Sequence, residues 1–470
     1  MRPKDELSQS EVAGYSRRLF LRRTAGAGLG LMAARTVPLG AAIQSSPPQE
    51  RIEVLTPLQR VPISFVIDDS TCLVNMGHFC MPQFATAWPN RAGYKKPWKS
   101  WPREIPDDFV REFVDFCGEF GVRGKYSIVP YPALVGWLDR ELPGWSRAEL
   151  LASLRLVRER VCPLFDIHPE MITHTRVIDL RTGRPMEQIS AATMENSFPQ
   201  EQKSVDELAA YLAYALRILK NCELPCEGIT TPGGFGNRVK RELSLAVQQA
   251  VRDVFGAEIP HYFKYVVDPG ENPAPRLEHV RRSQGDKVDL TVNVPAGTGD
   301  WFGGWDGSLK PRPDLYATED ASDGAMVHWI ERGGPAIMLC HWPGLYSNGT
   351  KAGFRAFQRV VRSLHARYGK RLLWMKLSEI ARYWAVRELA RIEPANESIQ
   401  LRSPFACRLF TFRWRGNLQR EPQLRTPDGR TVRLRRVPSS DLLDAGSYVV
   451  QQGTVLFCVN LPPGKGEILV

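Results

Sequence analysis

The sequence predicts an α/β protein, a barrel of about seven strands followed by a small C-terminal β-sandwich. Three observations support this fold class. Short apolar runs alternate with amphipathic stretches throughout residues 61–392. No glycine-rich dinucleotide loop follows the first apolar run, which disfavours the alternative, a doubly wound open sheet. From residue 393 onward, short strand-like runs separated by turn residues replace the helical period.

Each expected element has its own signal. The apolar run 61–67 predicts a buried strand, and residues 107–120 place four phenylalanines on one face of a helix. Ser146 with Glu149 and Ser204 with Glu207 are capping boxes, which predict helices over 147–161 and 205–222. The other expected strands are 122–129, 171–178, 228–231, 262–267, 288–294, 336–340 and 372–375, and the other expected helices are 238–255, 351–368 and 378–391.

The composition is that of a globular protein. The chain has 470 residues, of which 43% are hydrophobic and 24% charged, and this excludes a disordered, collagen-like or small disulfide-rich protein. Nine cysteines are an odd number without the paired spacing of a structural zinc site, so we expect most of them to be buried free thiols. We find no internal repeat.

The N-terminus has the composition of an export signal. Arg17 and Arg18 precede a short Gly/Ala-rich run, and small residues end the segment near position 42. It resembles a twin-arginine (Tat) signal, which implies the twin-arginine export machinery as a partner and a periplasmic or secreted location. We expect a signal at 1–42 and a linker at 43–60. The run is too short and glycine-rich to span a membrane, and no other stretch qualifies.

The net charge of +11 is smaller without this segment. Residues 1–42 contain seven Lys and Arg against three Asp and Glu, so +7 remains for residues 43–470. Basic residues elsewhere fall on expected helix faces without the interleaved aromatic residues of a nucleic-acid groove. We therefore expect no nucleic-acid partner.

Candidate catalytic residues follow three of the expected strands. Asp68 and Asp69 end the first strand, His174 lies in the third, and His341 ends the seventh. Reactive side chains of a parallel barrel lie at the C-terminal ends of its strands. Carboxylate and imidazole groups gathered there predict a metal-assisted hydrolytic site.

These residues resemble the polysaccharide deacetylase (NodB homology) superfamily, carbohydrate esterase family 4. Residues 64–70 (SFVIDDS) look like the family's Thr-Phe-Asp-Asp-Gly motif, and His174-Thr175 looks like the start of its His-Ser/Thr-x-x-His motif. Residues 230–234 (TTPGG) stand where Arg-x-Pro-Tyr-Gly is expected, and residues 339–341 match Leu-x-His.

The resemblance implies a distorted barrel that removes an N- or O-acyl group from a carbohydrate with a divalent metal, zinc by preference. It makes Asp68 the general base, Asp69 and His174 metal ligands, and His341 the general acid. The chain departs from the family at two positions, since Ile178 replaces the second motif histidine and Thr230 replaces the motif arginine.

A third metal ligand must therefore come from elsewhere. The candidates are His78, His168 and Asp179, with His78 ranked first because a loop after the Asp pair could fold it over the metal.

We also assign Trp301 and Trp305 to the substrate-binding surface, because indole rings stack on sugars, and the resemblance adds Pro232 from residues 230–234. Two other functions stay open. Asp68 with Asp300 or Asp306 could form the two carboxylates of a glycoside hydrolase on the same barrel. The protein could also bind glycans without turnover, in which case the changed positions 178 and 230 reflect a lost activity.

Overall fold

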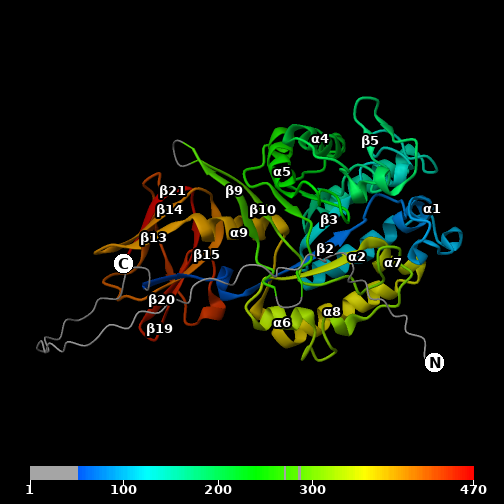
Figure 1. The fold of residues 1–470 in the computed structure, drawn as a ribbon. Helices are drawn as coiled ribbons and strands as arrows, with labels where there is room; N and C mark the ends of the chain where they lie inside the picture. Colours follow the sequence, from blue (N-terminus) through cyan, green and yellow to red (C-terminus); the bar gives the residue numbers. More distant parts are fainter. Residues whose placement is uncertain (1–50, 269–270, 284–286) are drawn as a thin grey trace, which may run out of the picture. The chain divides into compact units, whose positions relative to one another are not determined.

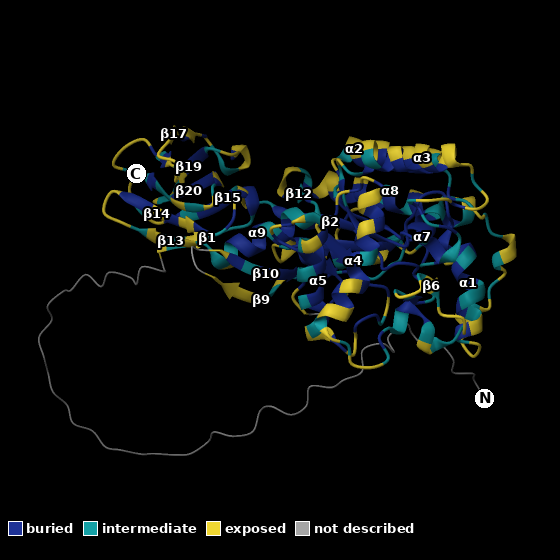
Figure 2. Cartoon of the chain, turned by 90° about the horizontal axis from the view of Figure 1, so that it is seen from above, coloured by how far each residue is buried: buried dark blue, intermediate teal, exposed yellow. Residues whose placement is uncertain are grey.

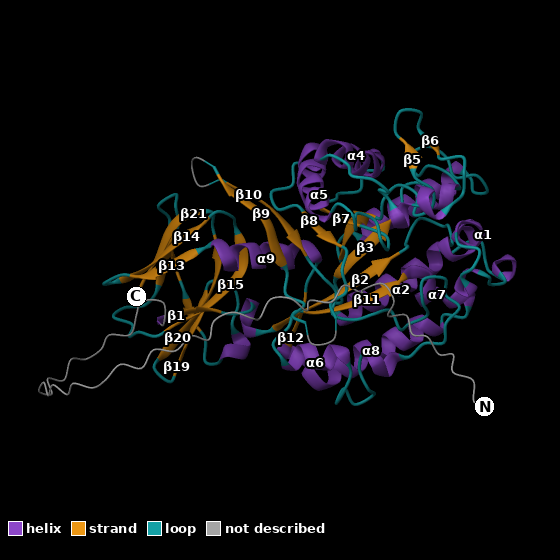
Figure 3. Ribbon diagram, viewed as in Figure 1, coloured by secondary structure: helices purple, strands orange, loops and turns teal. Residues whose placement is uncertain are grey.

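The computed structural model describes residues 51–268, 271–283 and 287–470 (Figure 1). The predicted export signal at 1–42 lies outside the described residues. In the described part, alternating strands and helices are followed by a region composed almost entirely of strands (Figure 3). The predicted mixed α/β class is therefore confirmed.

The first parallel sheet is built around β2 (Val61–Asp68), whose residues are all buried. A strand covered on both faces carries a continuous apolar run, which is why 61–67 has no alternation. The sheet has the order β11-β2-β3-β4, and β12 also pairs with β2. Its other strands are β3 (Gly124–Ile128), β4 (Phe165–Pro169), β11 (Ala336–His341) and β12 (Leu372–Trp374). Asp68 and His341 are Cα partners and are the last residues of β2 and β11, so they lie side by side at the C-terminal ends of these strands.

A second sheet continues the series of parallel strands. It has the order β7-β8-β10-β9, and β9 is antiparallel to β10. Its strands are β7 (Gly228–Thr230), β8 (His261–Phe263), β9 (Arg276–Arg282) and β10 (Val288–Asn293).

Isolated contacts join the two sheets. A parallel bridge links Glu170 to Thr230 beside β4. On the other side, the amide of Gly297 donates to the carbonyl of Ile337 at 2.9 Å. The strands thus form two sheets instead of the one continuous barrel sheet that the sequence predicts.

The helices begin and end close to the predicted residues. Helix α2 (Asp107–Phe120) has the predicted bounds, and both capping boxes form, at the starts of α3 (Arg147–Leu156) and α4 (Val205–Asn221). A π-helical turn at Val157–Val161 continues α3. The remaining helices are α5 (Lys240–Phe255), α6 (Ala325–Glu331), α7 (Trp342–Tyr346), α8 (Ala352–Tyr368) and α9 (Leu377–Leu389).

Helix α1 (Met76–Ala87) replaces the loop that we expected after the Asp pair. The Asn75 side chain caps it by accepting a hydrogen bond from the Gly77 amide at 3.1 Å. Pro82 lies inside this helix, and prolines there weaken the sequence signal. His78 therefore lies in the first turn of a helix and not on a folded-back loop.

The strand predicted at 171–178 is wrong. β4 ends at Pro169, and Met171 and His174 have φ angles of 54° and 60°. Positive φ is incompatible with a continuing strand. A small hairpin follows, made of β5 (Ile178–Asp179) and β6 (Arg184–Pro185). His174 thus lies in a loop beyond the sheet.

The C-terminal region consists of two five-stranded sheets. One has the order β1-β15-β20-β19-β18 and the other β13-β14-β21-β16-β17. The first contains β1 (Ile52–Val54), β15 (Cys407–Trp414), β18 (Arg435–Arg436), β19 (Ser447–Gln451) and β20 (Thr454–Leu461). The second contains β13 (Arg391–Pro394), β14 (Ser398–Ser403), β16 (Gln423–Arg425), β17 (Thr431–Arg433) and β21 (Gly464–Leu469). Because β1 pairs with β15, part of the expected linker at 43–60 belongs to this region.

The buried residues form a core around β2 and the inner helix faces (Figure 2). Phe65 stacks on Phe357 with ring centroids 4.4 Å apart. All nine cysteines are free and eight are buried, which confirms the prediction of free thiols. Among the described residues, no helix has the length and apolar character needed to cross a membrane.

Candidate active site

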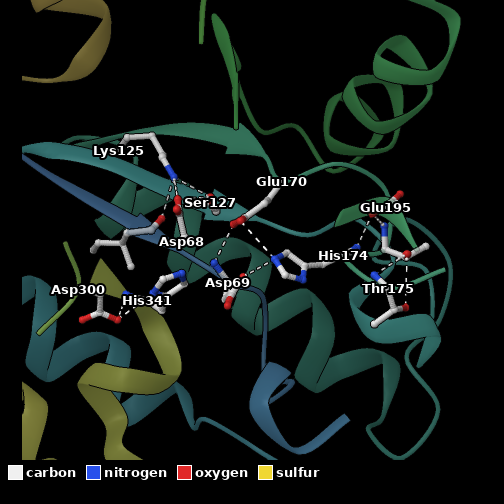
Figure 4. A network of polar contacts seen from close by, with 12 residues as sticks. Asp68, Asp69, Lys125, Ser127, Glu170, His174, Thr175, Glu195, Asp300 and His341 are labelled. Atoms are coloured by element: carbon white, nitrogen blue, oxygen red, sulfur yellow. Dashed lines mark hydrogen bonds and ion pairs between the residues drawn. The ribbon is translucent and has the colours of Figure 1, made fainter. Parts of the chain in front are cut away.

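Three side chains of types that can bind a metal ion lie together beyond the end of β2 (Figure 4). Asp69 Oδ1 lies 2.7 Å from His174 Nε2, and Glu170 Oε1 lies 3.4 Å from the same nitrogen. All three side chains are buried. Two carboxylates and one imidazole are a ligand set that Zn²⁺ and similar divalent ions accept.

The charges of this group favour a cation. The buried Asp69 Oδ1 faces the His174 imidazole, and the buried Glu170 carboxylate lies beside the same ring, so two acidic groups share one imidazole. Burial acts to lower the pKa of His174, but the charge of Asp69 outweighs it and the pKa lies well above its ordinary value. The ligand types, and the two carboxylates gathered around one imidazole, therefore fit a divalent metal.

The backbone brings the ligands together. Asp69 has a φ of 57°, which turns the chain directly after the strand. Its amide donates to Glu170 Oε2 at 2.7 Å, so the β2 and β4 ends are tied to each other. Glu170 was missed by the sequence reasoning, although it precedes His174 by four residues, a spacing that ligand pairs often have.

None of the three ligands proposed from the sequence lies with Asp69 and His174 in the described structure. His78 is instead held by its Nδ1, which lies 3.0 Å from the carbonyl oxygen of Trp101. His168 contacts another histidine through Nε2, and Asp179 lies in the β5–β6 hairpin. Glu170, and not His78, therefore lies with Asp69 and His174 in the group that could hold a metal.

Glu195 fixes the loop that carries His174. Its carboxylate accepts hydrogen bonds from the amides of Ile172, Thr173 and His174, at 3.1, 3.1 and 2.6 Å. The hydroxyl of Tyr211 donates to it at 2.6 Å. The carboxylate is fully buried. It thus holds the metal-ligand loop in its positive-φ conformation.

A buried lysine holds Asp68. Lys125 on β3 is fully buried, and its Nζ contacts Asp68 Oδ1, with further hydrogen bonds to Ser127 Oγ at 2.8 Å and to the Ile67 carbonyl at 3.0 Å. Burial raises the pKa of Asp68 to about 6, although the charge of Lys125 acts to lower it. Thr230, at the position of the family's arginine, faces His168 at 3.3 Å. A cation beside Asp68 is therefore present, but it comes from β3.

His341 forms a second acid–base pair with Asp300. Its Nδ1 lies 2.8 Å from Asp300 Oδ2 (Figure 4), and its side chain is 26% exposed. Burial acts to lower the pKa of His341, but the hydrogen bond that its ring donates to Asp300 and the charges of the nearby carboxylates raise it to about 10. The ring is thus held protonated at one edge of the site, as a proton donor requires.

The predicted substrate-binding residues are spread around this site. The Trp305 ring lies 5.2 Å from that of Phe84, which in turn lies 6.2 Å from the His174 ring. Trp301 packs on Tyr316 at 4.8 Å. Pro232 is buried in the turn after β7. Trp305 therefore packs on Phe84, which in turn neighbours the His174 ring. Among the described contacts, Trp301 and Pro232 have no such link to His174.

The carboxylates considered for a glycoside hydrolase are both engaged. Asp300 is bonded to His341, as described above. Asp306 is fully buried, pairs with Lys96 at 2.6 Å and accepts from the Ser308 amide at 3.0 Å.

A second group of ligand-type residues belongs to the core. His168 Nε2 and His261 Nε2 lie 3.0 Å apart in the interior, so one can donate to the other. The neighbouring Asp166 accepts from the amide and hydroxyl of Ser378, at 2.6 and 2.9 Å. Because His168 and His261 contact each other and Asp166 is held by Ser378, we assign them to packing and not to a metal.

No family model and no curated protein matches this chain. Solved structures with weak similarity include an alpha-fucosidase from Thermotoga maritima, with a TM-score of 0.27, 9% identity and coverage of 87% of this chain and 94% of that one. A structure described as alpha-L-fucosidase has a TM-score of 0.29, 10% identity and coverage of 89% and 98%. TM-scores this low establish neither a shared fold nor a shared function.

Proposed function

We propose that the protein is a metal-dependent hydrolase that removes an N- or O-acyl group from a carbohydrate. The observation that carries the proposal is the group formed by Asp69, Glu170 and His174, which lies beside a candidate base, Asp68, and a candidate acid, His341 (Figure 4). Such a set supplies each group that acyl hydrolysis needs. We read the two parallel sheets as the halves of one distorted barrel, whose strand ends carry these residues.

The metal site fits the ligand types present. A divalent ion held by Asp69, Glu170 and His174 would act as a Lewis acid toward the acyl carbonyl and the attacking water.

The protein's own groups move the protons. Asp68 takes a proton from the attacking water, and Lys125 keeps the Asp68 carboxylate oriented through the buried ion pair. His341 donates a proton to the leaving oxygen or nitrogen as the acyl bond breaks, while Asp300 orients its ring through Nδ1. The products are the free acid and the deacylated carbohydrate.

The carbohydrate and the export route come from the sequence. The motif order resembles that of polysaccharide deacetylases, and Trp305 packs on Phe84, which neighbours the His174 ring, so the indole could line a sugar site there. We propose that residues 1–42 direct the chain through the twin-arginine route to the periplasm or the exterior.

Acetate release from acetylated oligosaccharides tests this function. Wild type loaded with Zn²⁺ is expected to release acetate, and Asp69→Asn to lose at least about 100-fold in rate, because a metal ligand is lost. Asp179→Asn, which changes a carboxylate of the β5–β6 hairpin, serves as the matched control and is expected to retain activity. Zinc-loaded wild type that releases no acetate would contradict the proposal.

Glycoside hydrolysis is the second candidate, and one observation favours it. Asp68 has a raised pKa of about 6, which suits a general acid. New reducing ends without acetate would select this activity. Glycan binding without either product, unchanged in Asp68→Ala, would select a non-catalytic binding protein.

A further inference from the structure

A basic segment with interleaved aromatic residues connects α1 to α2. Residues 88–103 contain five Lys and Arg, no Asp or Glu, and four aromatic residues. In chain order these are Trp88, Arg91, Tyr94, Lys95, Lys96, Trp98, Lys99, Trp101 and Arg103. An excess of one sign over a short stretch attracts a partner of the opposite charge. We call residues 88–103 the aromatic–basic segment.

Most of its positive charge has no carboxylate partner. Lys96 pairs with the buried Asp306, with Nζ and Oδ2 2.6 Å apart. Within the described residues, the other four cations form no ion pair with a carboxylate, and all four are exposed: Arg91, Lys95, Lys99 and Arg103. The segment therefore presents positive charge to a ligand.

Two of these cations lie against aromatic rings of the same segment. The Arg91 guanidinium is 5.6 Å from the centroid of the Trp88 ring, and Lys99 Nζ is 5.8 Å from that of Trp98. Both tryptophans are half-buried, so part of each indole reaches the surface. The electron-rich face of an indole attracts a cation at this distance. Each pair thus offers an apolar ring and a positive charge side by side.

Hydrogen bonds hold the segment in place. The Asn75 side chain donates to the Pro102 carbonyl at 2.8 Å, and the Asn75 amide donates to the Arg103 carbonyl at 2.9 Å. Lys96 Nζ donates to Ser308 Oγ at 2.8 Å. The segment is therefore fixed both to the chain that follows β2 and to the loop at 301–308. A surface fixed in advance loses less conformational freedom when a ligand binds.

The aromatic–basic segment adjoins the candidate active site. The Tyr94 ring lies 5.3 Å from that of Phe84, which lies 6.2 Å from the His174 ring. Tyr94 also lies 5.8 Å from Trp305. A polymer bound along the segment can therefore extend toward the metal group.

Uronic acids have the chemistry that this surface fits. A uronic acid carries its carboxylate on the sugar ring itself, so one unit can stack on an indole while its carboxylate pairs with the neighbouring cation. Single-stranded nucleic acids also combine negative charge with stacking. The position beside a site that we assign to carbohydrate chemistry favours the glycan.

We propose that the aromatic–basic segment binds an acidic polysaccharide that contains uronic acids, and that an acylated unit of the same polymer is the substrate. The inference rests on the proposed function, because it names the class of carbohydrate on which the enzyme acts. The segment holds the charged part of the polymer while the acylated unit reaches the group formed by Asp69, Glu170 and His174.

Binding without turnover tests the proposal. The full chain carrying Asp69→Asn is titrated with polygalacturonate, with its methyl ester, which keeps the sugar backbone without the charge, and with single-stranded poly(dT). The test variant adds Arg91→Gln and Lys99→Gln. The matched control adds Arg408→Gln and Lys465→Gln, which remove two exposed cations from β15 and β21.

A second pair of variants tests the ring at position 98. Trp98→Phe keeps an aromatic face beside Lys99, whereas Trp98→Ala removes it. We expect Trp98→Ala to bind polygalacturonate at least about threefold more weakly than Trp98→Phe, because a stacking contact is lost.

We expect polygalacturonate to bind and its methyl ester not to bind at the same concentration. The Arg91 and Lys99 variant should bind at least about 10-fold more weakly than the control, because two charge-assisted contacts are lost. Equal affinity in the test and control variants, or in the two Trp98 variants, would overturn the proposal. So would equal binding of the methyl ester, or tighter binding of poly(dT) than of polygalacturonate.

The outcome is separate from that of the proposed function. Because turnover is not measured, absence of acetate release in zinc-loaded wild type would refute the proposed function and leave this binding result intact. Acetate release without polygalacturonate binding would refute the acidic substrate alone.

Discussion

The buried ion pair between Asp68 and Lys125 can be tested by changing single residues. Removing one partner of a buried pair leaves the other charge without compensation, which costs about 3–5 kcal/mol. We expect Lys125→Met to lower the free energy of unfolding by about that amount, as measured by urea denaturation.

The double variant separates the pair from its surroundings. Asp68→Asn combined with Lys125→Met removes both charges, so we expect it to be more stable than Lys125→Met alone. If the loss in free energy of unfolding in the double variant equals the sum of the losses in Asp68→Asn and Lys125→Met, then Lys125 does not act through Asp68.

Glu195 is expected to act on metal affinity through the loop that it fixes. Glu195→Gln keeps the shape but weakens the acceptor for three backbone amides and for Tyr211. Changes outside the ligand set commonly weaken metal binding by about 10–100-fold. We expect Zn²⁺ affinity, measured by titration, to fall within that range and the rate at saturating Zn²⁺ to recover.

The control for this change is Glu201→Gln, an exposed carboxylate that pairs with Lys203. It should leave Zn²⁺ affinity at the wild-type value. An unchanged affinity in Glu195→Gln would show that the loop does not depend on the Glu195 charge.

At the scale of elements, two strands place His168 and His261 together in the interior. Burial lowers the pKa of both rings, that of His261 to about 4, with Lys125 adding to the effect on His168 and Glu227 opposing it on His261. Because the folded pKa values lie below the ordinary value of 6.5, the unfolded chain binds protons first as the pH falls. The neutral His168 and His261 rings therefore make their full contribution to the stability of the fold above pH 6.5. This contribution is lost as the pH falls toward 4.

We therefore expect the free energy of unfolding to decrease between pH 6.5 and 4, by a contribution on the order of 3 kcal/mol from His261. His261→Asn should reduce this slope, whereas His328→Asn, which changes an exposed histidine, should not. Denaturation at several pH values checks it, and a slope that is the same in both variants speaks against the neutral pair.

The elements with local signals are the ones that the sequence predicts well. Capping boxes mark the starts of α3 and α4, and the apolar runs mark β2 and β11. Helix α1 was not predicted, because a proline lies inside it. The third strand was predicted at the wrong residues, because residues 171–178 are apolar enough to resemble a strand, whereas the backbone turns at Met171.

The site residues divide in the same way. Asp68, Asp69, His174 and His341 follow from motif order, and the structure brings them to one edge. The partners that give them their properties come from distant positions: Lys125 from β3, Glu195 from the segment before α4, and Asp300 from a loop. Spacing along the chain does not report such contacts, which only the folded chain creates.

The whole chain adds a prediction about its N-terminus, which lies outside the described residues. If residues 1–42 form a twin-arginine signal, then Arg17→Lys with Arg18→Lys should keep the protein in the cytoplasm of a bacterial host. Cell fractionation checks the outcome, with Arg22→Lys and Arg23→Lys as the matched control. Unchanged export of the first variant would refute the twin-arginine route.

We propose above that Asp69, Glu170 and His174 hold a divalent ion. Elemental analysis of the purified protein after dialysis against Zn²⁺ tests it most directly, with Glu170→Gln and His78→Gln as the paired variants. We expect about one ion per chain in wild type and in His78→Gln, and loss of the ion in Glu170→Gln. A metal-free wild type, or an ion that persists in Glu170→Gln and is lost in His78→Gln, would contradict it.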